Sequence, residues 1–159
     1  MPARRSAGLL LFRRSRRREI EVLLVHPGGP FWVRRDEHAW SIPKGEYEEG
    51  EDALCAAARE FEEELGCEPP RGQPIDLGTV VQSNGKHVRA WAIEGDLDVA
   101  RVASNTFEIE WPPRSGRRER FPEIDRAEWF DLPTARSKLI NAQVALLERL
   151  AELLSSGSR

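Results

Sequence analysis

Residues 45–67 decide the fold, and they read Gly45-Glu-Tyr-Glu-Glu-Gly-Glu51-Asp-Ala-Leu-Cys-Ala-Ala-Ala-Arg59-Glu60-Phe-Glu-Glu-Glu-Leu-Gly-Cys67. Neither proline nor glycine interrupts residues 52–65. Apolar side chains recur there with the spacing of one helical face, at Leu54, Ala58, Phe61 and Leu65. Gly66 suits the left-handed position that ends a helix, and Pro69-Pro70 prevents the helix from resuming. The stretch therefore predicts a helix over 52–65.

Three carboxylates gather on another side of this helix. Glu60, Glu63 and Glu64 fall within an arc of about 100° on a helical wheel. Like charges at this spacing repel each other, and the only base within the helix is Arg59. An acidic face in contact with solvent is one interpretation. The other is a site for a hard divalent cation, because Mg²⁺ prefers oxygen ligands and keeps several waters.

The spacing of the stretch favours the second interpretation. Gly45 is followed after five residues by Glu51, and after seven more by Arg59-Glu60-Phe-Glu-Glu-Glu-Leu-Gly-Cys67. This resembles the Nudix box of the Nudix hydrolase family, which is Gly, five of any, Glu, seven of any, Arg-Glu-aliphatic-any-Glu-Glu-any-Gly-aliphatic. All seven fixed identities are present, with Phe61 and Cys67 at the apolar positions. Such a match arises by chance on the order of 10⁻⁸ per start position.

The resemblance implies an α/β fold of Nudix type, an α/β/α sandwich with a mixed β-sheet flanked by helices. It implies cleavage of a diphosphate linkage in a nucleoside diphosphate joined to another group, with Mg²⁺ or Mn²⁺ as cofactor. It also implies a set of catalytic residues, namely Glu51, Arg59, Glu60, Glu63 and Glu64.

The roles within that set follow from position in the box. Glu63 and Glu64 would be the principal metal ligands, and Glu60 would be a ligand or the base that activates water. The backbone carbonyl of Gly45, or of the residue before it, would complete the metal shell. Arg59 would orient the carboxylates, and Glu51 would support the loop. Which glutamate is the base stays open.

The rest of the chain predicts one domain over residues 1–154 and a disordered tail over 155–159. Short apolar runs predict strands over 8–12, 20–25, 31–33, 39–42, 75–81, 87–93, 106–111 and 128–130. Asn84-Gly85 is a strong hairpin signal between two of them. A last helix is expected over 142–154. The segment 111–120 is expected to be a basic loop, either a flap over a polyphosphate or an exposed turn.

Composition excludes several classes of protein. The chain has 24 basic and 27 acidic side chains, so a net charge of −3 gives no overall reason to bind nucleic acid or an anionic membrane. No apolar run approaches the roughly 18 residues of a membrane span. Two cysteines are too few for a disulfide scaffold and lack zinc spacing. We therefore expect a cytoplasmic protein with a small nucleotide substrate and no membrane partner. The oligomeric state is not indicated.

Charge is nevertheless unevenly distributed. Residues 1–35 hold nine arginines and two acids, whereas residues 36–68 hold twelve acids and two bases. A metal site beside an anion site would produce this pattern, and so would two solvated faces.

The residues before the helix bear on the substrate. Trp40-Ser-Ile-Pro-Lys-Gly45 is similar to the stretch found in Nudix enzymes that cleave dinucleoside polyphosphates such as diadenosine tetraphosphate. The tyrosine usual after the box in those enzymes is replaced here by Asn84. The proline usual in ADP-ribose hydrolases is replaced by Gln82. We favour a dinucleoside polyphosphate, with a pyrophosphatase for oxidised nucleoside triphosphates as the alternative.

Four residues outside the box are candidate substrate ligands. Lys44, Lys86 and Arg89 carry charges suited to phosphate, and Arg pairs with phosphate bidentately. Trp32 offers a face on which a base can stack. Core packing or solvent exposure is the competing explanation for each of them. Glu123 is a candidate for an additional carboxylate late in the chain.

Two other functions are compatible with this sequence. A Nudix-like domain that binds a nucleotide without turnover would be expected to lose carboxylates of the box, and none is lost here. An RNA-end hydrolase would use the basic segments 13–18 and 114–120, although aromatic residues do not alternate with these arginines. Binding that weakens steeply with salt would favour RNA.

Overall fold

The computed structural model describes residues 4–157. In chain order its elements are β1 (Arg5–Arg14), β2 (Ile20–Pro27), β3 (Lys44–Glu46), α1 (Ala53–Leu65), β4 (Ile75–Val81), β5 (His87–Glu94), η1 (Val99–Arg101), β6 (Thr106–Glu110), β7 (Arg118–Pro122), β8 (Ile124–Asp131), α2 (Leu132–Lys138), η2 (Asn141–Gln143) and α3 (Val144–Gly157). None of the helices in this part of the chain has the length and apolar character needed to cross a membrane.

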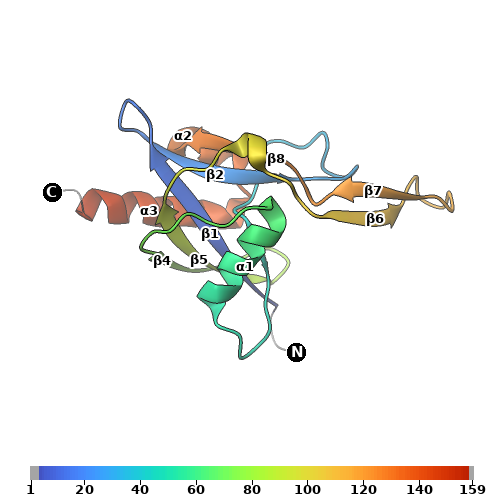
Figure 1. Cartoon of the computed structure of the whole chain (residues 1–159), viewed down its shortest axis with the longest axis horizontal. Helices are drawn as coiled ribbons and strands as arrows, with labels where there is room; N and C mark the ends of the chain where they lie inside the picture. Colours follow the sequence, from blue (N-terminus) through green and yellow to red (C-terminus); the bar gives the residue numbers. More distant parts are fainter. Residues whose placement is uncertain (1–3, 158–159) are drawn as a thin grey trace.

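A six-stranded mixed sheet forms the middle layer (Figure 1). Its strands lie in the order β4-β5-β1-β2-β8, and β3 pairs with the start of β1 on the edge that also bears β2. β1 and β5 are parallel, whereas the other pairs are antiparallel. β6 and β7 form a separate two-stranded sheet. The expected α/β/α sandwich with a mixed sheet is confirmed.

Alternating side chains of β1 build the two halves of the core. Leu10 and Phe12 face the layer that contains α2 and α3, whereas Leu9 and Leu11 face α1. All four are almost fully buried, because helices cover both faces of the sheet. β1 is therefore the strand on which both helical layers pack.

The predicted helix is confirmed, with a difference in its buried face. Asp52 caps α1 by accepting a hydrogen bond from the Cys55 N–H at 2.9 Å, and Gly66 ends it at φ 73°. Besides Phe61 and Leu65, the fully buried residues are Ala56 and Ala57, whereas the expected Leu54 and Ala58 are only half-buried. Ala56 and Ala57 are small, so the helix approaches the sheet closely on the side that carries them. The buried face is therefore rotated relative to the face that the apolar spacing predicted.

The strand predictions were correct for the sheet but failed in the loops. The runs over 8–12, 20–25, 75–81, 87–93 and 128–130 lie within the strands of the main sheet, and the run at 106–111 contains β6. The strand predicted over residues 31–33 is wrong, because this segment forms turns. The segment 39–42 makes only isolated bridges, at Trp40 and Ser41. Its apolar character reflects burial of Ala39, Trp40 and Ile42 rather than a strand.

Three elements escaped the sequence patterns. β3 has only three residues, and β7 is mostly charged, so neither shows apolar alternation. β7 also begins at Arg118, inside the expected basic loop. α2 did carry a signal, since Asp131 caps it and a proline follows in its first turn. α3 continues to Gly157, so the first part of the expected tail is helical, and Ser158 and Arg159 lie outside the described residues.

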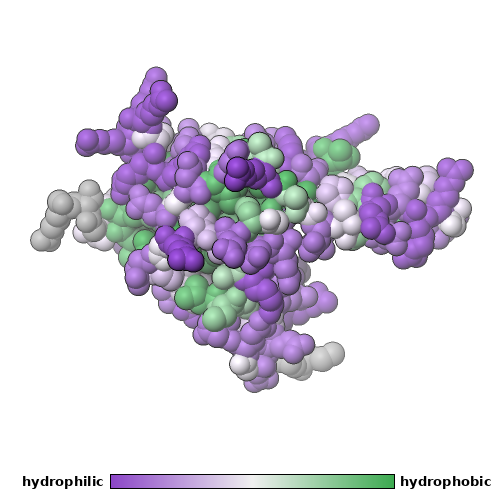
Figure 2. Space-filling view, in the orientation of Figure 1, coloured by the Kyte–Doolittle hydropathy of each residue, from purple (hydrophilic) through white to green (hydrophobic). Residues whose placement is uncertain are grey.

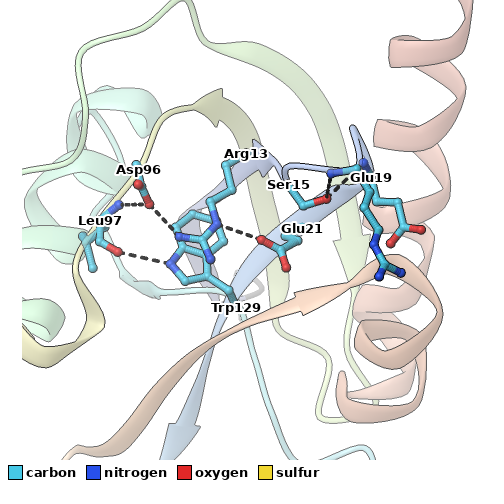
Figure 3. A network of polar contacts seen from close by, with 8 residues as sticks. Arg13, Ser15, Glu19, Glu21, Asp96, Leu97 and Trp129 are labelled. Carbon is cyan, nitrogen blue, oxygen red and sulfur yellow. Dashed lines mark hydrogen bonds and ion pairs between the residues drawn. The ribbon is translucent and has the colours of Figure 1, made fainter.

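A polar network fastens the β1–β2 hairpin to the neighbouring strands (Figure 3). The Arg13 guanidinium donates to Glu21 at 2.9 Å and to Asp96 at 2.7 Å. The same group lies over the Trp129 ring, 4.1 Å from its centroid. The Trp129 indole N–H donates to the Leu97 carbonyl at 3.1 Å. The network joins β1, β2, β8 and the segment after β5.

A buried amide connects three distant segments on the other side. The Oε1 of Gln143 accepts from the Ile42 N–H at 3.0 Å, and its Nε2 donates to Gln82 Oε1 and Ser41 Oγ, each at 3.0 Å. Gln143 is fully buried. Its amide therefore holds the segment before Lys44 against the turn between β4 and β5.

We predict that Gln143→Ala lowers the free energy of unfolding by about 2–4 kcal/mol, because it leaves buried polar partners unsatisfied and opens a cavity. Urea denaturation measures the change. Asn141→Ala is the matched control, since Asn141 lies in the same short helix and is exposed. Equal stability of the two variants would contradict the role given to the Gln143 amide.

Candidate active site

The loop strand β3 lies directly against the helix that carries the carboxylates. Gly45 is the Cα partner of Ala7 in β1, and α1 packs on the same strand. A Cβ added at Gly45 would overlap the Glu60 carboxylate. Position 45 therefore requires glycine, because the backbone of β3 lies in contact with the Glu60 side chain.

Arg59 lies among three carboxylates, as its assigned role requires. Its guanidinium pairs with Glu51, lies 3.2 Å from Glu60 Oε1 and 3.8 Å from Glu63 Oε1. Single exposed ion pairs contribute little to stability, but one guanidinium shared by three acids restricts the positions of all of them.

Glu64 is the most perturbed group of the site. Burial raises the pKa of Glu64 to about 8, against the opposing effect of the Lys44 charge, and the charges of Glu60 and Glu123 raise it further. The Lys44 backbone N–H donates to Glu64 Oε2 at 3.3 Å. Burial also raises the pKa of Glu60, with the charges of Glu63 and Glu123 acting in the same direction.

Glu123 belongs to this group although it follows β7, far along the chain. Its charge acts on both Glu60 and Glu64, and it lines the same cavity as Glu64. The segment that carries it is fixed to the loop after β2, because the Gly28 N–H donates to the Glu123 carbonyl at 2.9 Å. The sequence offered Glu123 only as a candidate late carboxylate, and the fold places it in the same cavity as Glu64.

A cavity of about 200 Å³ opens beside Glu64. It is lined by Val25, Pro27, Trp32, Ala39, Ser41, Ile42, Lys44, Glu64, Glu123, Ile124 and Ile140. Apolar walls with a few charged groups at one end are typical of sites for small molecules. The cavity brings together two of the four candidate substrate ligands, Lys44 and Trp32.

The other two candidates lie elsewhere. Lys86 is at the margin, with Nζ 3.7 Å from Glu46 Oε1, and its charge lowers the pKa of Lys44 in addition to the larger effect of burial. Arg89 pairs with Asp76 and lies over the Trp91 ring, 4.7 Å from its centroid. It lines a different cavity, which Glu64 does not line.

The carboxylates do not converge on one point in this structure. In residues 4–157, no three carboxylate, imidazole or thiol groups are arranged to hold a metal ion. The donor chemistry nevertheless fits a hard cation. Glu60 and Glu64 are desolvated and face further acids, and such groups are stabilised by a cation with oxygen ligands. The residues available to hold it are Gly45, through its carbonyl, and Glu60, Glu63 and Glu64.

Known proteins match this chain in sequence and in fold. Residues 2–150 match the family described as NUDIX domain. An octanoyltransferase of Myxococcus xanthus is 35% identical over 123 residues, which cover 76% of this chain. The chain spans only 29% of the length of that relative.

Two solved structures illustrate the likeness in fold. The first is a C. elegans Ap4A hydrolase binary complex, with a TM-score of 0.67 and 22% identity, covering 96% of this chain and 98% of that one. The second is the NUDIX domain of Shewanella oneidensis NrtR complexed with ADP ribose, with a TM-score of 0.63 and 16% identity, covering 97% of this chain and 90% of that one. At these identities the likeness shows the fold.

We predict that Gly45→Ala preserves the fold but impairs catalysis. The new Cβ meets the end of a flexible side chain, so the Glu60 carboxylate moves while the backbone stays in place. Displacement of a reacting group by about an ångström can cost about 10²-fold in kcat. Turnover and thermal unfolding of the same preparation test this. Full activity, or loss of folded protein, would contradict it.

We also predict that the metal-free protein loses stability as the pH rises from about 4.5 to about 8. Glu64 binds its proton more tightly in the folded than in the unfolded state, so the free energy of unfolding falls across this interval. Urea denaturation in EDTA at several pH values measures the slope. Glu64→Gln should flatten it, whereas Glu62→Gln, an exposed change in the same helix, should not. An equal slope in all three proteins would refute the assignment.

Proposed function

This chain belongs to the NUDIX domain family. We propose that it is a pyrophosphohydrolase that cleaves dinucleoside polyphosphates with a divalent cation as cofactor. The observation that carries the proposal is the cavity where Glu64, Lys44 and Trp32 meet. The cationic group of Lys44 suits the phosphates of such a substrate, and the aromatic face of Trp32 suits a base. The Glu64 carboxylate suits the metal ion that accompanies the phosphates.

The chain's own residues prepare the site for an anionic substrate. Glu60, Glu63 and Glu64 would hold the cation together with the Gly45 carbonyl, and Arg59 would keep the carboxylates in place. When bound, the cation would shield the charge of the phosphates and would lower the pKa of a water molecule. Lys44 supplies positive charge at the wall of the cavity, next to Glu64.

The candidates for accepting a proton from water are the two desolvated carboxylates, Glu60 and Glu64. A general base works best when its pKa lies near the working pH, and burial raises the pKa values of both Glu60 and Glu64. Either of them is suited to accept the proton of the attacking water, and whichever of the two also held the cation would be the weaker base.

The preference for dinucleoside polyphosphates is supported by two observations. The Pro-Lys-Gly sequence at residues 43–45 is similar to that of the enzymes cleaving these compounds, and its lysine lines the cavity. The chain also shares its fold with the C. elegans Ap4A hydrolase. A nucleoside triphosphate pyrophosphatase is the alternative, favoured by the absence of the usual tyrosine at Asn84. The octanoyl transfer named for the Myxococcus relative is not proposed here, because the chain covers 29% of that protein.

We predict that the protein with Mg²⁺ cleaves diadenosine tetraphosphate to ATP and AMP, and that EDTA abolishes the reaction. Glu63→Gln and Glu64→Gln should each lower kcat by about 10²-fold or more, because each removes a charge that the cation requires. Product analysis by chromatography measures both effects. Glu62→Gln, in the same helix but outside the site, should retain activity.

A panel with dGTP, 8-oxo-dGTP and ADP-ribose distinguishes the alternatives. Release of pyrophosphate from a triphosphate, without cleavage of the dinucleotide, would replace the proposed substrate by the alternative. Binding of nucleotides without any turnover, in Mg²⁺ or in Mn²⁺, would contradict an enzyme and favour a binding module.

A further inference from the structure

The β6–β7 hairpin, here called the arm (residues 106–122), stands outside the main sheet. It has its own two-stranded ladder, from Thr106 paired with Pro122 to Glu110 paired with Arg118. It extends from the body of the molecule (Figure 1), and it is largely hydrophilic in Figure 2. The core does not require such an extension, because both faces of the main sheet are already covered by helices.

Aromatic contacts attach the arm to the loop after β2. Phe107 packs over Gly29, where an added Cβ would lie 2.9 Å from the ring. Trp111, at the tip end of β6, meets Phe31 edge to face, with ring centroids 5.4 Å apart. The loop is held from the other side by His26, whose Nε2–H donates to the Arg35 carbonyl at 2.5 Å.

The outer side of this contact exposes apolar surface. Phe31 is 62% exposed, Trp32 36% and Val33 64%, and they are consecutive in the chain. Three of the five large hydrophobic residues exposed in the described structure therefore lie in one loop, beside Trp111. Such a cluster is typical of a binding surface rather than of scattered surface residues.

The same surface continues into the candidate active site. Trp32 lines the cavity that contains Glu64, and Phe31 is its neighbour in the chain. Glu123 also lines the cavity and directly follows the arm, and its N–H donates to the Asn105 carbonyl at the arm's base at 2.8 Å. The cavity and the exposed aromatic residues are therefore adjacent.

Four arginines lie close to these aromatic residues in the chain. Arg34, Arg35, Arg114 and Arg117 are exposed, and in residues 4–157 none of them is within ion-pair distance of a carboxylate. The Arg35 guanidinium lies over the Trp32 ring, 5.4 Å from its centroid. Guanidinium groups without partners are available to phosphate, and aromatic faces are available to a base.

We propose that this surface, the aromatic ledge formed by Phe31, Trp32 and Trp111 with the arginines Arg34, Arg35, Arg114 and Arg117, binds the distal nucleoside phosphate of a dinucleoside polyphosphate. The assignment rests on the proposed function. A cavity of about 200 Å³ accommodates one base, so the second nucleoside and its phosphates must lie outside. The ledge is the neighbouring surface with the required chemistry, a π-face together with cations.

The test compares ligands with and without a distal nucleoside. Dissociation constants for diadenosine tetraphosphate and for ATP are measured by calorimetry in EDTA, where no turnover occurs. The variants are Phe31→Ala, Trp111→Ala and Arg114→Gln combined with Arg117→Gln. Leu153→Ala, an exposed apolar truncation in α3, is the matched control. Because Phe31 is mostly exposed, its truncation leaves the fold intact even if Trp111→Ala disturbs the arm.

We expect wild-type protein and the control to bind the dinucleotide more tightly than ATP. Phe31→Ala should weaken binding of diadenosine tetraphosphate by about tenfold, as expected for the loss of one base–aromatic stack, and binding of ATP by less than about twofold. The arginine variant should show the same selectivity.

Three outcomes would overturn the inference: equal affinity of the wild type for both ligands, equal weakening of both by the variants, or no effect of Phe31→Ala. Tighter, strongly salt-dependent binding of a 5′-triphosphate RNA, lost in the arginine variant, would assign the ledge to RNA instead. Turnover of the wild type is measured separately, so failure of the proposed substrate is distinguished from failure of the ledge.

Discussion

The contact between Gly45 and the Glu60 carboxylate is the constraint on which the site depends. β3 and α1 both lie on β1, one by hydrogen bonding and the other by packing of Ala56 and Ala57. A larger side chain at Ala56 or Ala57 would push the helix away from the sheet, and one at Gly45 would displace the Glu60 carboxylate. The proposed metal site thus depends on residues without functional groups, because their size permits carboxylates and backbone carbonyls to approach each other in a desolvated place. Burial disfavours negative charge there, as the raised pKa values of Glu60 and Glu64 indicate, and a bound cation would offset that effect.

Local sequence was sufficient for the helix and for the five longer strands of the main sheet, but not for the three-residue strand β3. The spacing of Gly45, Arg59 and Glu64 is also a local property, and the structure carries Gly45 on β3 and the other two on α1. What failed is not local. The apolar run at Phe31 looks like a strand, but its side chains face solvent. Arg89 stays a candidate phosphate ligand, and its guanidinium forms an ion pair with Asp76 across the hairpin, which its own sequence neighbours do not indicate.

Residues distant in sequence complete the site, and these are the ones that sequence reasoning could weigh only weakly. Glu123 reaches Glu64 because β8 pairs with β2 at the far edge of the sheet. Gln143 reaches Ile42 because η2 packs under the segment that leads to Lys44. Neither position has a distinctive neighbour in the chain. Pairing of strands and burial of one amide give them their importance, and both are consequences of tertiary structure.

The separate ladder of the arm has a consequence for how this protein can diversify. Its backbone hydrogen bonds are internal, and none of its strands pairs with the main sheet. Insertions or exchanges at its tip, between Trp111 and Arg117, therefore leave the packing on β1 undisturbed. Selection can act on ligand choice there while the hydrolytic centre is kept, so that new specificities would arise by remodelling an appendage rather than by redesigning a core.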